Sequence, residues 1–349
     1  MLFYYFNVDV NKNKNKTKNE WEITRKIKLK VNNLHDCNKQ QHLKDIAVFS
    51  FTRMLSKCSS LVTTKWLHNI VKNGTPKDLR VLDSSWHMPA TKRIGRQEYE
   101  DKHIPGALFF DISECCDKSS PYSHMLPNTE QFELYLNNLG ITASTHVIVY
   151  DASANSGFFS APRAWWMFRL FGHEMVSILD GGFTKWCAEE FPTTSEVIKP
   201  QKSTFNAKFQ HKMVKSYEDT TQNLKDNAYQ MMDARGPGRF NGTEPEPRPD
   251  IEPGHMNGSK NVPYSSIVDK ENNCLLDTES LKGVFKEAEI DLSKPLVATC
   301  GSGVSACCAA FAAHMCGKEV PVYDGSWTEF YLRSTPDMRV CPSDKKSDK

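Results

Sequence analysis

The sequence repeats itself once, and this repeat constrains the fold more than any other feature. Four segments of the first half recur in the same order in the second half: VLDSS, HIPGA, HVIVYDAS and DGGFTKW correspond to MMDAR, HMNGS, PLVATCGS and DGSWTEF. The matches place Asp83 against Asp233, His103 against His255 and Asp151 against Cys300. Self-similarity at a nearly constant spacing indicates two copies of one structural unit.

Each copy alternates short β-branched runs with helical patterns. In the first copy VIVYD is followed by a Gly/Ser turn and by APRAWWMFRLFG, which ends at Gly172. VSILDGG then precedes FTKWCAEEF. Such alternation predicts the α/β class, with a mainly parallel sheet flanked by helices in each copy. Ligands of these sheets bind beyond the carboxyl ends of the strands, so the loops after Tyr150 and Thr299 are the candidate sites.

The repeat also divides the chain. We expect five parts: a basic extension over 1–60, a first domain over 61–190, a linker over 191–214, a second domain over 215–340 and a polar tail over 341–349. The linker prediction rests on Pro192, Pro200 and the mostly polar positions around them.

Charge and hydropathy exclude two classes of protein. The 349 residues carry a net charge of +2, which argues against a nucleic-acid binder, and no run of apolar residues is long enough for a membrane helix. The extension over 1–60 is basic, and 46–62 is apolar and acid-poor, as a mitochondrial presequence beginning at Met54 would be. An unstructured or untranslated extension fits equally well, so a mitochondrial and a cytoplasmic location both remain open.

Eleven cysteines need an explanation in a chain of this length. Their number is odd and no C-x2-C pair is present, so neither a disulfide framework nor a zinc site is predicted. We interpret them as reduced intracellular thiols that mostly fill the core.

One cysteine stands apart, because it follows the strand-like LVAT. Cys300 begins the loop CGSGVS, after which ACCAAFAAHMCG is helical in pattern. Gly301 and Gly303 allow successive N–H groups to converge on an anion, and the helix N-terminus adds positive charge. Both effects favour a nucleophilic thiolate. A buried structural cysteine is the alternative, whereas a C-x5-R phosphatase is excluded because Ala306 stands where the arginine is needed.

Several motifs resemble the tandem-rhodanese sulfurtransferases over about residues 60–340. CGSGVSAC, EPGH and DGSWTEFY look like the second, catalytic domain of this family, while HIPGALFFD, SPYSHMLP and YDASANSGFFSAPRAWWMFRLFGH look like its first, inactive domain. Asp151 in place of the cysteine accounts for one active site rather than two. The resemblance implies that sulfur is carried as a persulfide on Cys300, with no metal and no organic cofactor.

The loop sequence discriminates within the family. Members that prefer thiosulfate resemble CRKGVT, whereas CGSGVS is similar to the members that use 3-mercaptopyruvate. The resemblance therefore implies 3-mercaptopyruvate as donor, pyruvate as product, and a thiol such as thioredoxin, or cyanide in vitro, as acceptor. A monomer or weak homodimer is expected. A thiosulfate:cyanide sulfurtransferase and a catalytically idle binding module are the alternatives.

The resemblance also implies a set of site residues. Arg239 and Arg248 would hold the carboxylate and keto oxygen of the donor, which suits the bidentate guanidinium fork; surface arginines in a Pro-rich loop are the alternative. Ser302 would polarise the carbonyl or relay a proton. His103 would reach the site across the domain interface, or else would pack its own turn. The remaining substrate-binding candidates are loop residues: Gly301, Gly303, Val304 and Ser305.

Three further residues are predicted to be structural. We expect Arg235 to be ion-paired and His255 to be a packing histidine. Cys316 is interpreted as a buried thiol in preference to a redox-active one.

Overall fold

The computed structural model of the chain describes residues 59–153 and 157–343. Both repeats belong to one compact unit, which begins at Ser60. The predictions for the basic extension, including the presequence and Met54, and for most of the polar tail lie outside the described residues.

The first repeat is built on a five-stranded sheet in which every neighbouring pair is parallel. Its strand order is β1-β5-β4-β2-β3. The strands are β1 (Leu61–Val62), β5 (Val176–Leu179), β4 (His146–Tyr150), β2 (Leu79–Asp83) and β3 (Ala107–Phe109).

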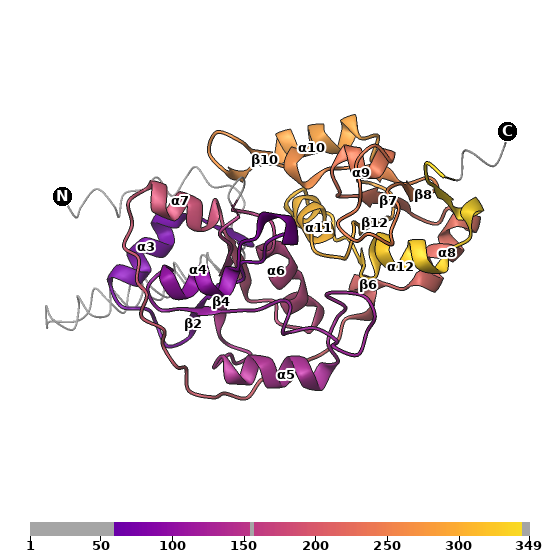
Figure 1. Cartoon of the computed structure of the whole chain (residues 1–349). Helices are drawn as coiled ribbons and strands as arrows, with labels where there is room; N and C mark the ends of the chain where they lie inside the picture. The colour runs from indigo at the N-terminus through magenta and orange to yellow at the C-terminus, as the bar shows by residue number, and fades with distance from the viewer. Residues whose placement is uncertain (1–58, 154–156, 344–349) are drawn as a thin grey trace, which may run out of the picture. The chain divides into compact units, whose positions relative to one another are not determined.

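The second repeat has a parallel sheet of the same design, in the order β6-β13-β12-β7-β9. Its strands are β6 (Val214–Lys215), β13 (Val322–Tyr323), β12 (Leu296–Thr299), β7 (Gln230–Asp233) and β9 (Lys260–Asn261). Strand for strand the two orders correspond, which confirms the repeat and the α/β fold predicted from it (Figure 1).

Helices separate the strands in both repeats. In the first they are α3 (Thr64–Lys72), α4 (Gly95–Asp101), α5 (Thr129–Asn138), α6 (Ala161–Leu170) and α7 (Gly182–Ala188). In the second they are α8 (Tyr217–Asp226), α9 (Pro237–Asn241), α10 (Thr278–Glu287), α11 (Ala306–Met315) and α12 (Ser326–Arg333). Two antiparallel ribbons complete the second repeat: β8 (His255–Met256) with β14 (Arg339–Val340), and β10 (Val268–Asp269) with β11 (Cys274–Leu275). Short 3₁₀ turns cover Pro89–Thr91, His211–Met213, Tyr264–Ser266 and Pro336–Met338.

Local sequence explains where these helices begin and end. Asn128 and Ser216 each form a capping box at the start of α5 and α8, and Asp277 accepts two backbone N–H groups at the start of α10. Gly172 and Gly317 follow α6 and α11 with φ angles of +86° and +83°, a conformation that glycine adopts without strain.

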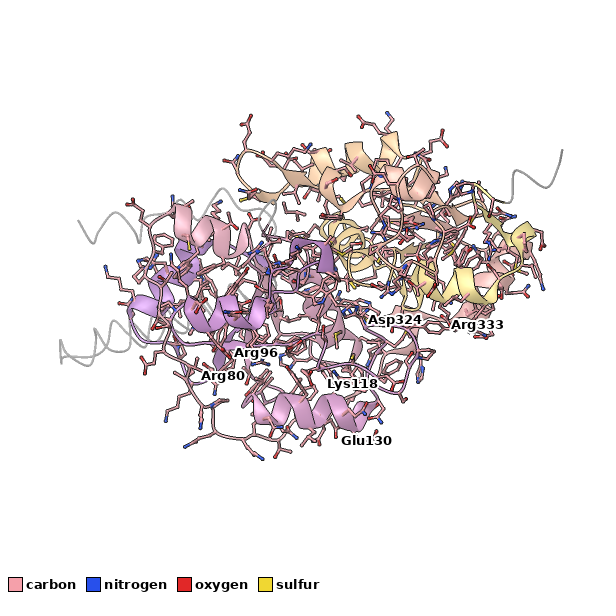
Figure 2. The ribbon with its side chains drawn as sticks, in the orientation of Figure 1. Arg80, Arg96, Lys118, Glu130, Asp324 and Arg333 are labelled. Atoms are coloured by element: carbon pink, nitrogen blue, oxygen red, sulfur yellow. The ribbon has the colours of Figure 1, made fainter. Side chains whose placement is uncertain are left out.

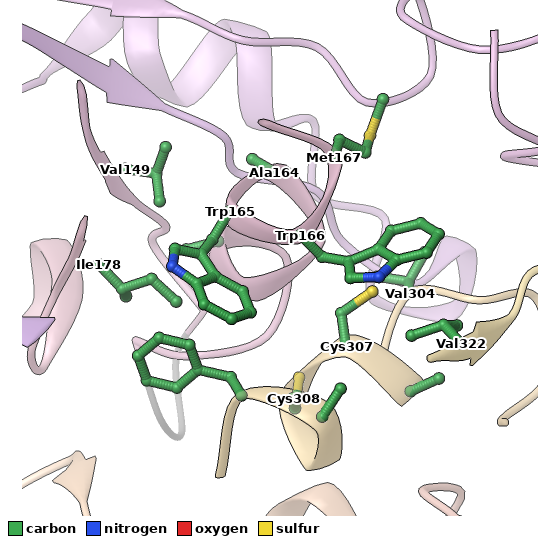
Figure 3. Packing of buried hydrophobic residues seen from close by; sticks show 14 of the residues in the cluster. Val149, Ala164, Trp165, Trp166, Met167, Ile178, Val304, Cys307, Cys308 and Val322 are labelled. Atoms are coloured by element: carbon green, nitrogen blue, oxygen red, sulfur yellow. The ribbon is translucent and has the colours of Figure 1, made fainter. Parts of the chain in front are cut away.

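One apolar core is shared by the two repeats. It joins side chains of α5 and α6 to side chains of α10 and α11, and it reaches the facing sides of both sheets. In this core α6 and α11 pack directly against each other; Trp165 and Trp166 of α6 face Cys307 and Cys308 of α11 (Figure 3). Smaller clusters cover the outer faces, beneath α3, α4 and α7 in the first repeat and beneath α8 and α12 in the second.

In the part of the chain that the structure describes, no helix combines the length and the apolar character that crossing a membrane would need.

Candidate active site

The Cys300 loop lies at the carboxyl end of β12 and is held by the start of α12. Cys300 is only 2% exposed. Its carbonyl oxygen accepts the N–H of Trp327 at 2.9 Å. The carbonyl oxygen of Gly301 accepts both the N–H and the Oγ1–H of Thr328, at 3.1 and 2.7 Å. These bonds turn two loop carbonyls toward α12.

Ser326 fixes the loop from the same side. Its Oγ accepts the N–H groups of Cys300 and Gly303, both at 3.1 Å, and donates to the carbonyl of Tyr323. Ser326 has a φ of +52°, and its counterpart Gly182 in the first repeat has +53°. The sequence reasoning missed this residue, although the pair DGG and DGS in the two repeats was the available signal.

Four backbone amides of the loop are available to bind an anion. Among the described residues, no acceptor hydrogen-bonds to the backbone N–H of Gly301, Ser302, Val304 or Ser305. These amides lead directly into α11, whose N-terminus adds partial positive charge. The arrangement matches the anion-binding nest expected around the Cys300 sulfur.

The first repeat fills the corresponding nest with its own carboxylate. Asp151 stands at the Cys300 position, and its Oδ2 accepts the N–H groups of Phe159, Ser160 and Ala161 at 2.7–2.9 Å. An anion therefore already satisfies the amides at the start of α6. This geometry explains physically why the first repeat offers no nucleophile there.

A pocket of about 630 Å³ lies beside this first-repeat position, with Asp83, Ala152, Thr184 and Cys187 in its wall. Burial raises the pKa of the Cys187 thiol, which keeps it protonated. No residue of this wall combines a thiol with a strand-end nest. The cysteine that does follow a strand end and precede a helix is Cys300, in the second repeat.

Arg239 lies directly against the Cys300 loop. A Cβ added at Gly301 would come within 2.6 Å of its Nη2, so glycine leaves room for the guanidinium. The same Nη2 donates to Glu246 at 2.5 Å, and Nε donates to Glu246 at 3.1 Å. The side chain is 21% exposed, so it remains accessible to a small ligand.

Arg248 approaches the same loop through α12, since its Nη1 donates to Thr328 Oγ1 at 3.1 Å. Burial, together with the charge of Arg239, lowers the pKa of Arg248, while Glu246 and Cys300 oppose this shift. The structure thus brings Arg239 against the Cys300 loop and Arg248 to Thr328, which is bonded to the same loop.

Arg235 is buried in a closed ion network, as predicted. It donates to Asp233, to Glu246 at 2.8 Å and to the carbonyl of Gly254, and it lies over the Trp327 ring at 4.9 Å. Glu246 is therefore shared by Arg235 and Arg239.

The other predicted loop residues occupy distinct environments. Ser302 is partly exposed, and its hydroxyl has no hydrogen-bond partner within the described ranges. Gly303, Val304 and Ser305 are buried. Gly303 has a φ of +77°, and a Cβ there would come within 2.9 Å of the Asp324 carboxylate.

The structure does not bring His103 to this loop. The histidine is fully buried in the first repeat, with Nδ1 2.5 Å from the Tyr99 carbonyl and Nε2 3.2 Å from the Glu196 carbonyl. Its ring stacks on Tyr99 at 4.1 Å. His255 repeats this arrangement, with Nδ1 2.8 Å from the Phe240 carbonyl and its ring stacked on Phe240 at 4.1 Å. Because the two copies use the histidine alike, these contacts favour the packing alternative for His103, and its role at the site stays a prediction.

A chain of aromatic rings in the first repeat reaches the second repeat, and the sequence reasoning missed it. His124 packs edge-on against Trp86 at 4.8 Å, and Trp86 stacks on Phe159 at 5.9 Å. Phe159 contacts Tyr264 of the second repeat at 4.9 Å. Burial, and then the charges of Arg163 and Arg248, lower the pKa of His124 to about 3, so its imidazole is neutral.

The remaining cysteines do not form a second reactive cluster. All nine cysteines in the described ranges are free thiols. Cys316 is half-buried rather than buried as expected, and burial raises its pKa. Among the same residues, no three His, Cys, Asp or Glu side chains come together as a metal site requires.

Two parallel-sheet repeats of one strand order, with a single cysteine in a strand-end nest, define a tandem α/β protein with one thiol site. The rhodanese-like domain family matches residues 63–189 and 216–333. The chain belongs to this family, and it is a sulfurtransferase.

Named relatives agree with this class. The chain is 48% identical to human (Homo sapiens) 3-mercaptopyruvate sulfurtransferase over 284 residues, which is 80% of this chain and 94% of that protein. It is 46% identical to thiosulfate sulfurtransferase of Rattus norvegicus over 284 residues, 80% of this chain and 95% of the relative. The crystal structure of SseA from Escherichia coli, a 3-mercaptopyruvate sulfotransferase, matches with a TM-score of 0.69 at 35% identity and covers 77% of this chain and 99% of its own.

Proposed function

We propose that the enzyme takes sulfur from 3-mercaptopyruvate, holds it as a persulfide on Cys300 and passes it to an acceptor thiol. The observation that carries this proposal is the loop itself: it has four amides without an acceptor among the described residues, two arginines approach it, and the sequence CGSGVS contains no cation. This charge suits the single carboxylate of mercaptopyruvate better than the doubly charged thiosulfate.

The reaction divides into two sulfur transfers. The Cys300 thiolate attacks the donor sulfur, the donor carbon–sulfur bond breaks, and its electron pair remains on carbon as the enolate of pyruvate. A proton then completes pyruvate. Arg239 and Arg248 bind the carboxylate and keto oxygen and stabilise the enolate, while the loop amides stabilise the charge on sulfur.

In the second transfer an acceptor thiolate attacks the outer sulfur of the persulfide, and Cys300 leaves as the thiolate. Reduced thioredoxin would be such an acceptor, and cyanide would serve in vitro. Ser302 is partly exposed at the loop, and its hydroxyl would hydrogen-bond to the donor carbonyl. A mitochondrial or a cytoplasmic location and a monomer or weak homodimer complete the proposal.

Mass spectrometry and steady-state kinetics test this function. Incubation with 3-mercaptopyruvate should add one sulfur atom to Cys300 and release pyruvate. Cys300→Ser should abolish both while the protein stays folded, since the change is small and lies in a loop. A higher kcat/KM for thiosulfate would instead favour the second candidate, which the 46% identical relative keeps in view. An unmodified Cys300 would exclude sulfur transfer.

A further inference from the structure

One buried cation of the first repeat reaches into the loop of the second. Arg163 lies on α6, and its side chain is 1% exposed. Its Nη1 donates to Asp324 Oδ1 at 2.6 Å and to the Gly303 carbonyl at 3.3 Å, while its Nη2 donates to the His124 carbonyl. One guanidinium therefore links the Cys300 loop to two other segments, those of Asp324 and His124.

The loop packs directly on this ion pair. A Cβ at Gly303 would lie 2.9 Å from Asp324 Oδ1 and 3.0 Å from Arg163 Nη1. The second oxygen of Asp324 accepts the N–H of Leu126 in the first repeat at 2.8 Å. Asp324 is thus held by the first repeat on both oxygens, and Figure 2 shows it where the two repeats meet.

Comparison of the two repeats shows that only the first has an arginine at this helix position among the described residues. Aligned helix start for helix start, Arg163 of α6 corresponds to Cys308 of α11, whose thiol points back to the Phe159 carbonyl. The backbone contact is symmetric, since Asp180, the counterpart of Asp324, accepts the N–H of Leu275. The guanidinium is not symmetric, and it serves the loop that carries the nucleophile.

Stability alone does not account for such a residue. Burying an ion pair costs desolvation that its attraction barely offsets, and apolar side chains of similar size are often as stable or more so. A planar cation with several fixed donors does something apolar residues cannot, because it sets the position of a carbonyl and a carboxylate at once.

We propose that Arg163 is a positioning residue for sulfur transfer: through Asp324 and the Gly303 carbonyl it sets the geometry of the Cys300 nest. The proposal deepens, and rests on, the proposed function. The first repeat, which has Asp151 in place of a nucleophile, thereby helps to fix the geometry of the active site in the second. Because Arg239 and Arg248 keep their own partners, donor binding does not depend on Arg163, whereas the rate of the sulfur-transfer step does.

The test compares Arg163 with a matched arginine on the same helix. Arg169 also stacks on a tryptophan, at 4.7 Å against 4.8 Å for Arg163, and also pairs with an acid of the second repeat, Glu319. It does not touch the Cys300 loop. Arg163→Met, Arg163→Lys and Arg169→Met are made in the full chain and assayed well below their melting temperatures.

The readouts are the single-turnover rate of persulfide formation on Cys300 and KM, each with 3-mercaptopyruvate and with thiosulfate. Arg163→Met should lower the single-turnover rate by roughly 10–100-fold with KM changed less than about threefold, as expected when reacting groups are slightly misplaced. Arg163→Lys, which keeps the charge but not all three bonds, should fall between. Arg169→Met should stay within about twofold of the wild type.

The outcomes separate the two proposals. If the wild type uses only thiosulfate, 3-mercaptopyruvate is not the donor. The role of Arg163 is then tested by the single-turnover rate with thiosulfate. Equal losses in Arg163→Met and Arg169→Met, a change confined to KM, or an unchanged rate would overturn the positioning role. If Arg163→Met does not fold, Arg163→Lys decides in the same way. A wild type inactive with both donors overturns both proposals.

Discussion

Glu246 is the residue on which the arginine arrangement depends. Its two oxygens bond to Arg235 and Arg239, and its side chain is almost fully buried. Arg235 is enclosed by its own partners, and Glu246 orients Arg239 so that Nη2, which donates to Glu246, also lies toward Gly301. A lysine has a single ammonium group in place of the planar guanidinium. It cannot bond to Glu246 and offer a two-point contact to a ligand at the same time.

Arg239→Lys should therefore raise KM for 3-mercaptopyruvate. A charge-assisted hydrogen bond contributes about 1.5–3 kcal/mol, which corresponds to roughly 10–150-fold in kcat/KM. Arg93 offers a matched control, because it forms the same two-point pair with Glu98 in the first repeat, at 2.7 Å each. Arg93→Lys should leave kcat/KM unchanged. Equal values for Arg239→Lys and the wild type would show that Arg239 is only a loop residue.

The choice of donor is tested at Gly301 and Ser302, the two positions after Cys300. Adding cations at Gly301 and Ser302 would imitate the thiosulfate-type loop, but a side chain at Gly301 requires the Arg239 guanidinium to shift from its place beside Glu246. Ser302 is partly exposed, so Ser302→Lys adds charge without this shift. With cyanide as acceptor, Ser302→Lys should raise kcat/KM for thiosulfate and lower it for 3-mercaptopyruvate. Gly301→Arg should lose activity with mercaptopyruvate. Unchanged donor preference in Ser302→Lys would place selection elsewhere, at Arg239 and Arg248.

At the scale of elements, the matching strands β2 and β7 end on aspartates with different partners. Asp233 is paired with Arg235, two residues later. Asp83 has Ser85 at that place, which donates its N–H at 2.9 Å and its hydroxyl at 2.5 Å. Without a cation, burial raises the pKa of Asp83 to about 7.

This strand end should make stability depend on pH. The folded state binds the Asp83 proton more tightly than the unfolded chain, whose pKa is about 3.8. Stability is therefore lost as pH rises through the window from about 4 to about 7. Asp83→Asn cannot ionise, so its free energy of unfolding relative to wild type should rise by about 2–3 kcal/mol between pH 5 and pH 8. Denaturant unfolding at both values measures this. A pH-independent difference would mean that Asp83 ionises normally.

Most elements could be predicted from the sequence, because their patterns are local. The strands around Val81, Val149 and Ala298 and the helices α6 and α11 follow from β-branched runs, helical periodicity and terminal glycines. The two-residue strands of the ribbons β8–β14 and β10–β11 carry no such period, and tertiary pairing alone defines them.

The candidate site was also predictable only in part, because some of its contacts are tertiary and leave no local sequence pattern. Cys300, Arg239 and Arg248 belong to recognisable motifs, whereas the role of Arg163 comes from contacts across the repeats. Arg163 did leave one signal, a charge on the otherwise apolar first turns of α6. The motif of His103 left a site role and a packing role open, because hydrogen bonding to backbone carbonyls depends on a fold that the motif does not reveal.

At the scale of the whole molecule, the two repeats act as one body because they share their main core. Phe311 of α11 is fully buried, and its ring lies 4.7 Å from that of Trp165 and 5.2 Å from that of Phe158, both in the first repeat. Helix α11 is apolar on nearly every side, so it would expose this surface if the second repeat stood alone.

This shared core predicts one cooperative unfolding transition for the two repeats. Phe311→Ala removes a buried ring, which typically costs about 3–5 kcal/mol, and in a chain of this size should lower Tm by roughly 5–15 °C. Since the ring packs on the first repeat, calorimetry should show the whole transition shifting as one peak. Cys300→Ser, which leaves the shared core intact, is the control and should melt close to the wild type. Two resolved transitions, of which Phe311→Ala moves only one, would show that the repeats unfold independently and that their contact is too weak to hold Arg163 against the Cys300 loop.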